Sequence, residues 1–70
     1  MENSVYKVIE IIGSSSRSWD DAATNAVAKA NKTLDDLRIA EVVSMDMKVE
    51  NGKVSAYRTK LRLSFKFKSD

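Results

Sequence analysis

The dipeptide Asn51-Gly52 lies between two runs of alternating, β-forming residues, 37–49 and 53–68. A two-residue turn of type I′ needs positive φ at both central positions, and Asn-Gly is well suited to it. The two runs are therefore predicted to form an antiparallel hairpin. A fixed turn also determines which residues lie opposite each other, so this feature limits the fold more than any other in the chain.

Counting outward from this turn predicts the pairs Glu50 with Lys53, Val49 with Val54, Met45 with Arg58, Val43 with Lys60, Val42 with Leu61, Glu41 with Arg62, Ala40 with Leu63, and Ile39 with Ser64. Side chains alternate between the two faces of a strand. One face of the second run is then apolar and should meet a helix; it carries Tyr57, Thr59, Leu61, Leu63, Phe65 and Phe67. The opposite face carries Arg58, Lys60 and Arg62 against Met45, Val43 and Glu41.

The residues before the hairpin predict one strand and one helix. Residues 4–12 are rich in β-branched side chains, and Gly13 with the following serines should end that strand. Ser18 is a favourable helix N-cap, with Asp21 three residues on. Apolar residues then recur at helical spacing, and Trp19 should seal the end of the core. The expected fold is α+β over residues 1–70: a β-α-β-β domain with a three-stranded antiparallel sheet packed on one helix.

The chain has 70 residues, no cysteine and no histidine. A domain of this size buries only about 60% of its unfolded surface, and small domains are usually supported by disulfides, metals or oligomerisation. Disulfides, thiolate or imidazole metal sites and Cys or His nucleophiles are excluded, so we expect a self-associating protein that is not an enzyme. The lack of cysteine suits a reducing cytoplasm. We also expect no signal peptide and no membrane partner.

Positive charge is concentrated at the C-terminal end. Residues 1–52 carry six Lys/Arg and nine Asp/Glu, whereas residues 53–70 carry six Lys/Arg and one Asp. A basic strand of this kind favours anionic ligands. The alternative function is therefore a structural module, or a module that binds anions, metal ions or nucleic acid through this strand. Nucleic acid is the weaker choice, because base stacking needs exposed aromatics and those of this strand should face the helix. The candidate oxygen ligands for Mg²⁺ or Ca²⁺ are Asp35, Asp36, Glu41 and Asp46.

Length, order and spacing together resemble the dodecins over nearly the whole chain. The resemblance rests on VYKVIEIIGSS, SWDDAATNAVAKANKTLDDL, IAEVV and AYRTKLRLSFKF, in that order. Dodecins are small β-α-β-β proteins that form hollow homododecamers and bind flavins. The resemblance implies helices towards the outside of the shell, sheets that line its cavity, and riboflavin or FMN as the ligand.

Two positions depart from the flavin-binding members of that family. Ile39 stands where they usually have a Trp that stacks on the flavin ring, and Arg58 stands where they have a Gln that binds the flavin edge. We therefore expect a non-catalytic homododecameric shell that binds, stores or buffers a small ligand, with weak flavin binding and a metal ion or anion as other candidates. The expected ligand-binding residues are Arg38, Ile39, Glu41, Met45, Arg58, Lys60 and Arg62.

Overall fold

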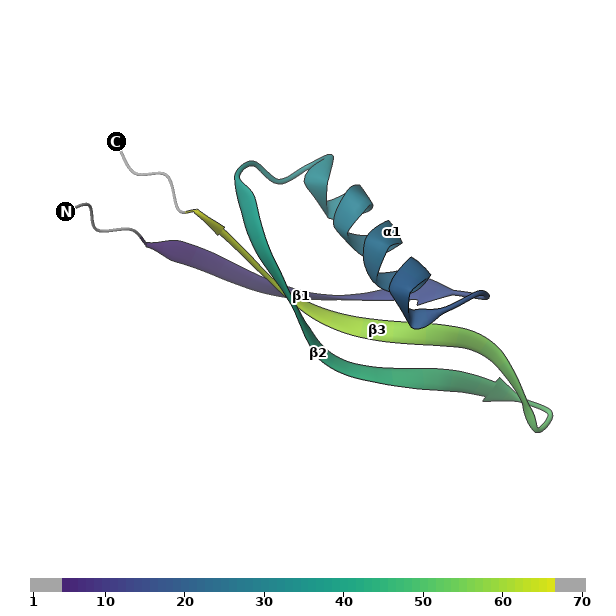
Figure 1. The fold of residues 1–70 in the computed structure, drawn as a ribbon. Helices are drawn as coiled ribbons and strands as arrows, with labels where there is room; N and C mark the ends of the chain where they lie inside the picture. Colours follow the sequence, from purple (N-terminus) through teal and green to yellow (C-terminus); the bar gives the residue numbers. More distant parts are fainter. Residues whose placement is uncertain (1–4, 67–70) are drawn as a thin grey trace.

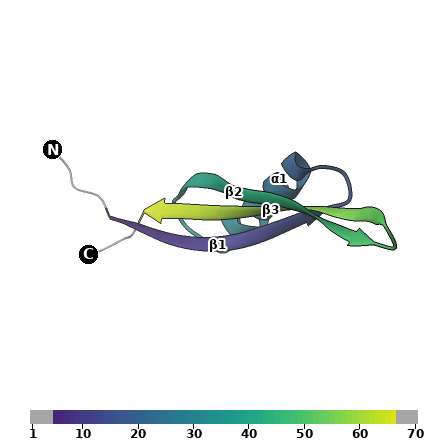
Figure 2. The ribbon, with the colours of Figure 1, turned by 90° about the horizontal axis from the view of Figure 1, so that it is seen from below.

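The computed structural model describes residues 5–66, which form strand β1 (Tyr6–Ser15), helix α1 (Trp19–Asn31), strand β2 (Leu37–Glu50) and strand β3 (Lys53–Lys66). The strands form one antiparallel sheet in the order β1-β3-β2, so β3 is central. Helix α1 lies on one face of this sheet, and the β2–β3 hairpin extends beyond it (Figures 1 and 2). The predicted α+β fold is confirmed.

The hairpin turn has the predicted geometry. Asn51 has a φ of 53° and Gly52 a φ of 76°, the positive values that a type I′ turn requires. Glu50 faces Lys53 as expected. The neighbouring pair of Val49 with Val54 is confirmed as well, and so are the four predicted pairs at the far end of the hairpin, from Val42 with Leu61 to Ile39 with Ser64.

The middle of the hairpin differs from the prediction. Arg58 lies opposite Asp46 and not Met45, and Lys60 lies opposite Ser44 and not Val43. The register shifts by one residue near the turn, where Ser55 on β3 is extra, and shifts back where Val43 on β2 is extra. Each bulge puts two residues of one strand opposite one residue of the other strand. Between the two bulges, the side chains of β2 therefore point to the opposite faces from those predicted.

Helix α1 begins as predicted. The Ser18 side chain is the N-cap and accepts a hydrogen bond from the backbone N–H of Asp21 at 2.9 Å. The Asp21 carboxylate accepts hydrogen bonds from the side chains of Ser15 at 2.7 Å and Arg17 at 3.2 Å. These bonds tie the end of β1 to the first turn of the helix, and they lower the pKa of Asp21, with the Ser15 hydrogen bond as the largest cause.

Strand β1 continues through Gly13, where the sequence predicted its end. Gly13 is buried beneath the helix. A Cβ atom at this position would overlap the carbonyl oxygen of Ala22 and lie 2.9 Å from the Cβ of Ala26. The glycine therefore allows close contact between helix and strand, and it does not act as a strand breaker here. Residue 4, at the predicted start of the strand, lies outside the described residues.

The core lies between α1 and the two strands β1 and β3. Its buried apolar residues are Ala22, Ala26, Leu61 and Leu63. Trp19 is half-buried at the helix start, where its ring meets Tyr57 edge-on with centroids 5.1 Å apart, which agrees with its predicted packing role. Phe67, also expected on this face, lies outside the described residues. Strand β2 is exposed beyond Leu37, because the helix contacts β1 and β3 more extensively.

Candidate functional site: the open face of the sheet

The face of the sheet that points away from α1 carries most of the charged side chains predicted to bind a ligand. Alternation places them there, because residues directly opposite each other on antiparallel strands share a face. We call this surface the open face and define it by Glu10 on β1, Ile39, Glu41 and Asp46 on β2, and Arg58, Lys60 and Arg62 on β3.

One end of the open face is a cluster of two cations and two carboxylates. Arg62 donates from Nε and Nη2 to Glu10 Oε2 at 3.2 and 2.8 Å, and its Nη1 lies 3.6 Å from Glu41 Oε1. Lys60 Nζ lies 3.5 Å from Glu10 Oε1. The Arg62 hydrogen bond is the largest cause that lowers the pKa of Glu10, followed by the charge of Lys60. The predicted pair of Glu41 with Arg62 is therefore present, but the shorter contact is with Glu10.

Glu10 was not among the predicted site residues. The hairpin register relates only β2 to β3, so it contains no information on which residue of β1 faces Arg62. The available signal was a single acid in the otherwise apolar run VIEII. Such a residue in a strand flanked by apolar neighbours indicates a charged partner on the next strand.

The other end of the open face is a bidentate ion pair between Arg58 and Asp46. Arg58 donates from Nε to Asp46 Oδ1 and from Nη2 to Asp46 Oδ2, both at 2.7 Å. Two parallel hydrogen bonds fix the orientation of the guanidinium as well as its distance. They lower the pKa of Asp46 and raise that of Arg58. The backbone oxygen of Asp46 accepts a further hydrogen bond from Trp19 Nε1 at 3.0 Å.

The structure brings together five of the seven predicted ligand-binding residues. Besides the charged residues above, Ile39 lies on the open face with 58% of its surface exposed. Met45 does not belong there, because the bulge at Val43 turns it to the helix side, opposite Thr59. Arg38 is the extra residue at an irregularity in β2, where its guanidinium lies 3.7 Å from the carboxylate of Asp36.

The open face offers fixed, charge-assisted donors beside carboxylate acceptors, an arrangement suited to binding a polar or anionic ligand. Within residues 5–66, no three carboxylates come close enough to hold a metal ion together. A cation bound through Glu10, Glu41 or Asp46 would therefore need further ligands from outside the described part of one copy. In the same residues, no helix is both long and apolar enough to cross a membrane.

Comparison with known proteins agrees with this architecture. The sequence model of the Dodecin family matches residues 5–68. The chain is 49% identical over 65 residues to a protein of Mycobacterium tuberculosis named calcium dodecin, covering 93% of this chain and 92% of the relative. A crystal structure of calcium dodecin from that organism, described as calcium chelating and as having a novel calcium-binding site, superposes with a TM-score of 0.82 at 52% identity over 93% of each chain.

A dodecin structure from Streptomyces coelicolor is similar over the full length of both chains. Its TM-score is 0.92 at 34% sequence identity. The likeness therefore extends from sequence to three-dimensional structure. These matches show that the chain belongs to the dodecin family, whose members are small ligand-binding proteins and not enzymes, as the sequence predicted.

Proposed function

We propose that this protein is a non-catalytic homododecameric shell whose open face lines the interior and binds a small ligand. The observation that carries the proposal is the open face itself: oriented, ion-paired arginines on a sheet that its own helix covers from one side only. Among residues 5–66, four apolar residues are buried, so a single copy has little core of its own. Association of copies would supply the missing cover.

Flavins are proposed to bind weakly. Ile39 provides apolar contact but no aromatic ring, and ring stacking contributes about 0.5–1.5 kcal/mol beyond burial. Arg58 has no hydrogen-bond acceptor, and its donors Nε and Nη2 are directed to Asp46. Of the two flavins, FMN should bind better than riboflavin, because its phosphate can accept charge-assisted hydrogen bonds from arginine and lysine.

A fluorescence-quenching titration with riboflavin and FMN tests this ligand assignment. We expect a colourless purified protein, weak binding to the parent chain, and at least about tenfold tighter binding by the double variant Ile39→Trp with Arg58→Gln. Ile12→Trp with Arg58→Gln is the matched control, since it adds an indole to another exposed open-face position. Sub-micromolar riboflavin affinity of the parent, or no gain in the double variant, contradicts the assignment.

A divalent cation is the second candidate ligand, supported by the relative named calcium dodecin. The exposed carboxylates of Glu10, Glu41 and Asp46 supply suitable oxygen ligands, and water molecules or a second copy would complete the coordination of the ion. Isothermal titration with CaCl₂, with MgCl₂ as comparison, measures this binding. We expect Glu41→Gln to weaken Ca²⁺ binding, because Glu41 has only the longer of the two Arg62 contacts. Unchanged affinity in that variant would remove Glu41 from the site.

Two expectations from the sequence stay predictions. A cytoplasmic location agrees with the absence of cysteine from the sequence. Nucleic acid is not the proposed partner, because base stacking needs exposed aromatic side chains and Tyr57 packs against Trp19 on the helix side.

A further inference from the structure

The hairpin turn that fixes the register also carries a reactive amide. The chain has four asparagines, at positions 3, 25, 31 and 51, and only Asn51 precedes a glycine. The backbone nitrogen of the next residue can attack an asparagine side chain at Cγ, and glycine hinders this attack least because it has no Cβ. Both turn residues are exposed, and nothing lies within 4 Å of the place that a Cβ on Gly52 would occupy.

Hydrogen bonds do not restrain either of the two reacting groups. Within residues 5–66, neither the side-chain amide of Asn51 nor the backbone N–H of Gly52 is bonded to another residue. The bulge at Ser55 lies close by, so only two residue pairs, Glu50 with Lys53 and Val49 with Val54, separate it from the turn. A hairpin end held by so few contacts, beyond the cover of α1, can change conformation without disturbing the core.

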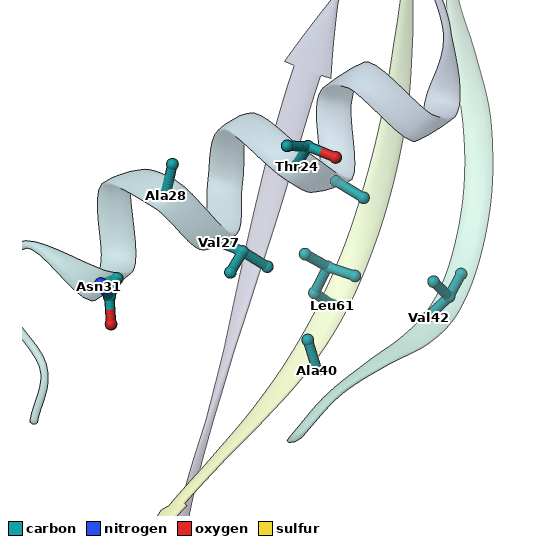
Figure 3. Close-up of a pocket in the computed structure, with 8 residues that line it drawn as sticks. Thr24, Val27, Ala28, Asn31, Ala40, Val42 and Leu61 are labelled. Atoms are coloured by element: carbon teal, nitrogen blue, oxygen red, sulfur yellow. The ribbon is translucent and has the colours of Figure 1, made fainter. Parts of the chain in front are cut away.

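The other two asparagines in the described part of the chain lie in helix α1 and are restrained. The Asn25 amide donates from Nδ2 to Asp21 Oδ2 at 3.2 Å. Asn31 lines a groove of about 420 Å³ between α1 and β2, as Figure 3 shows. The nitrogen that would have to attack it belongs to Lys32 and donates to the carbonyl of Lys29 at 3.2 Å. Both residues therefore serve as internal controls for Asn51.

The turn is one peptide rotation away from a reactive conformation. Attack requires the Cβ of Asn51 and the nitrogen of Gly52 to lie on the same side of the Cα–C bond. A type I′ turn has ψ of about 30° at its first central residue, which keeps these two atoms apart. A type II′ turn retains the positive φ there but has ψ of about −120°, which brings them together.

Rotation of the single peptide plane between Asn51 and Gly52 converts one turn into the other. The rotation reverses the sign of φ at the second central residue, which glycine tolerates in either direction. Both turns are two-residue hairpin turns, so Glu50 can remain opposite Lys53 throughout. The reactive conformation is therefore accessible to the folded hairpin.

We propose that Asn51 is a site of spontaneous deamidation in the folded protein. The Gly52 nitrogen bonds to Asn51 Cγ, its proton passes through solvent to the departing amide, and ammonia leaves a five-membered succinimide ring. Water then opens the ring at one of its two carbonyls. One product is an aspartyl residue, and the other is an isoaspartyl residue, whose main chain runs through the former side chain. Either product lowers the net charge of the chain from +2 by one unit.

The two products affect the hairpin differently. Asp-Gly suits a type I′ turn as Asn-Gly does, so the aspartyl product keeps the register. The isoaspartyl product adds one carbon atom to the main chain of the turn. Because turn length determines register, Glu50 and Lys53 can no longer pair as before.

Peptide mapping by mass spectrometry tests the proposal after the native protein has been incubated at mildly alkaline pH. We expect conversion at Asn51 to be at least about tenfold faster than at Asn25 or Asn31, with an isoaspartyl methyltransferase labelling part of the product. Asn51→Gln is the matched variant, because its ring would need six members, and it should form no acidic species on ion exchange. Equal rates at the three asparagines overturn the proposal, as does conversion of Asn51 in guanidinium chloride but not in the native protein.

Thermal unfolding of the separated products tests the consequence for the turn. Asn51→Asp should unfold within about 2 °C of the parent, and the isoaspartyl fraction from ion exchange should unfold about 4–8 °C lower at equal protomer concentration. An isoaspartyl fraction as stable as Asn51→Asp would contradict the loss of pairing at the turn.

Discussion

Replacing Gly13 by alanine should destabilise the protein by inserting one methyl group between strand and helix. The added Cβ would overlap the carbonyl oxygen of Ala22 and lie 2.9 Å from the Cβ of Ala26. The carbonyl belongs to the helix backbone and cannot rotate away as a side chain could. Helix α1 must therefore move as a whole, and its separation from β1 also determines how it sits on Leu61 and Leu63.

The expected cost is about 2 kcal/mol of unfolding free energy. Overpacking a filled interior costs about 1–3 kcal/mol, and a clash with backbone belongs at the upper end. Replacing glycine also reduces the conformational entropy of the unfolded chain, which stabilises the folded protein by about 0.4–1 kcal/mol. For a domain of this size, 1 kcal/mol corresponds to about 4–8 °C, so we expect the midpoint of thermal unfolding to fall by roughly 8–16 °C.

Circular dichroism during heating, at one protomer concentration, measures this change, since self-association makes the midpoint concentration-dependent. Ser14→Ala is the matched control, because Ser14 is the exposed neighbour of Gly13 and should leave the midpoint nearly unchanged. Adding Ala26→Gly to Gly13→Ala should not restore stability, since the carbonyl contact remains. A Gly13→Ala protein as stable as its parent would refute the close-contact explanation.

The remaining predictions concern the open face and the helix end. Arg62→Glu should weaken stability or assembly, because it places a carboxylate beside Glu10 in place of a 2.8 Å ion pair; an unchanged thermal midpoint and unchanged sedimentation would count against that pairing. The folded-state pKa values of Glu10, Asp21 and Asp46 are lowered by hydrogen bonds from arginine or serine. The contribution of these carboxylates to the unfolding free energy should therefore be full at neutral pH and decline as the pH falls below about 4.5 towards those pKa values. Urea titrations from pH 7 to pH 3 measure this decline, and Asp46→Asn should make the unfolding free energy depend less on pH. Trp19→Phe should lower the unfolding free energy by about 0.5–1.5 kcal/mol, because it removes the hydrogen bond from the indole to the Asp46 backbone oxygen. Chemical denaturation measures this change, and an unchanged unfolding free energy would show that the bond contributes nothing.

The sequence was sufficient to predict the elements of the fold. Ser18 and the Asn51-Gly52 turn each determine local geometry through their own backbone and side chain, so no distant residue was needed. The ends of the predicted hairpin register were also correct, although its middle was wrong. The two single-residue bulges lie in different strands and their register shifts cancel, so the pairs outside the bulges are the same with or without them.

The site was only partly predictable for the same reason. Arg58 and Arg62 could be assigned to the open face from alternation along β3 alone. The acids that make the shortest contacts with them could not be predicted. Asp46 lies opposite Arg58 only because the bulges shift the register, and Glu10 belongs to β1, on the other side of β3 from β2. Gly13 was misjudged as a strand end because its role depends on the approach of a helix that follows it in the chain.

Trp19 is the only tryptophan of the chain, and this has a practical consequence. Its indole N–H bonds to the backbone of the residue whose carboxylate holds Arg58 on the opposite side of the sheet. A ligand that draws Asp46 away from Arg58 would disturb that backbone and change the emission of the indole without touching it. The unlabelled protein thus contains its own optical probe of the open face, and a fluorimeter can screen candidate ligands against it.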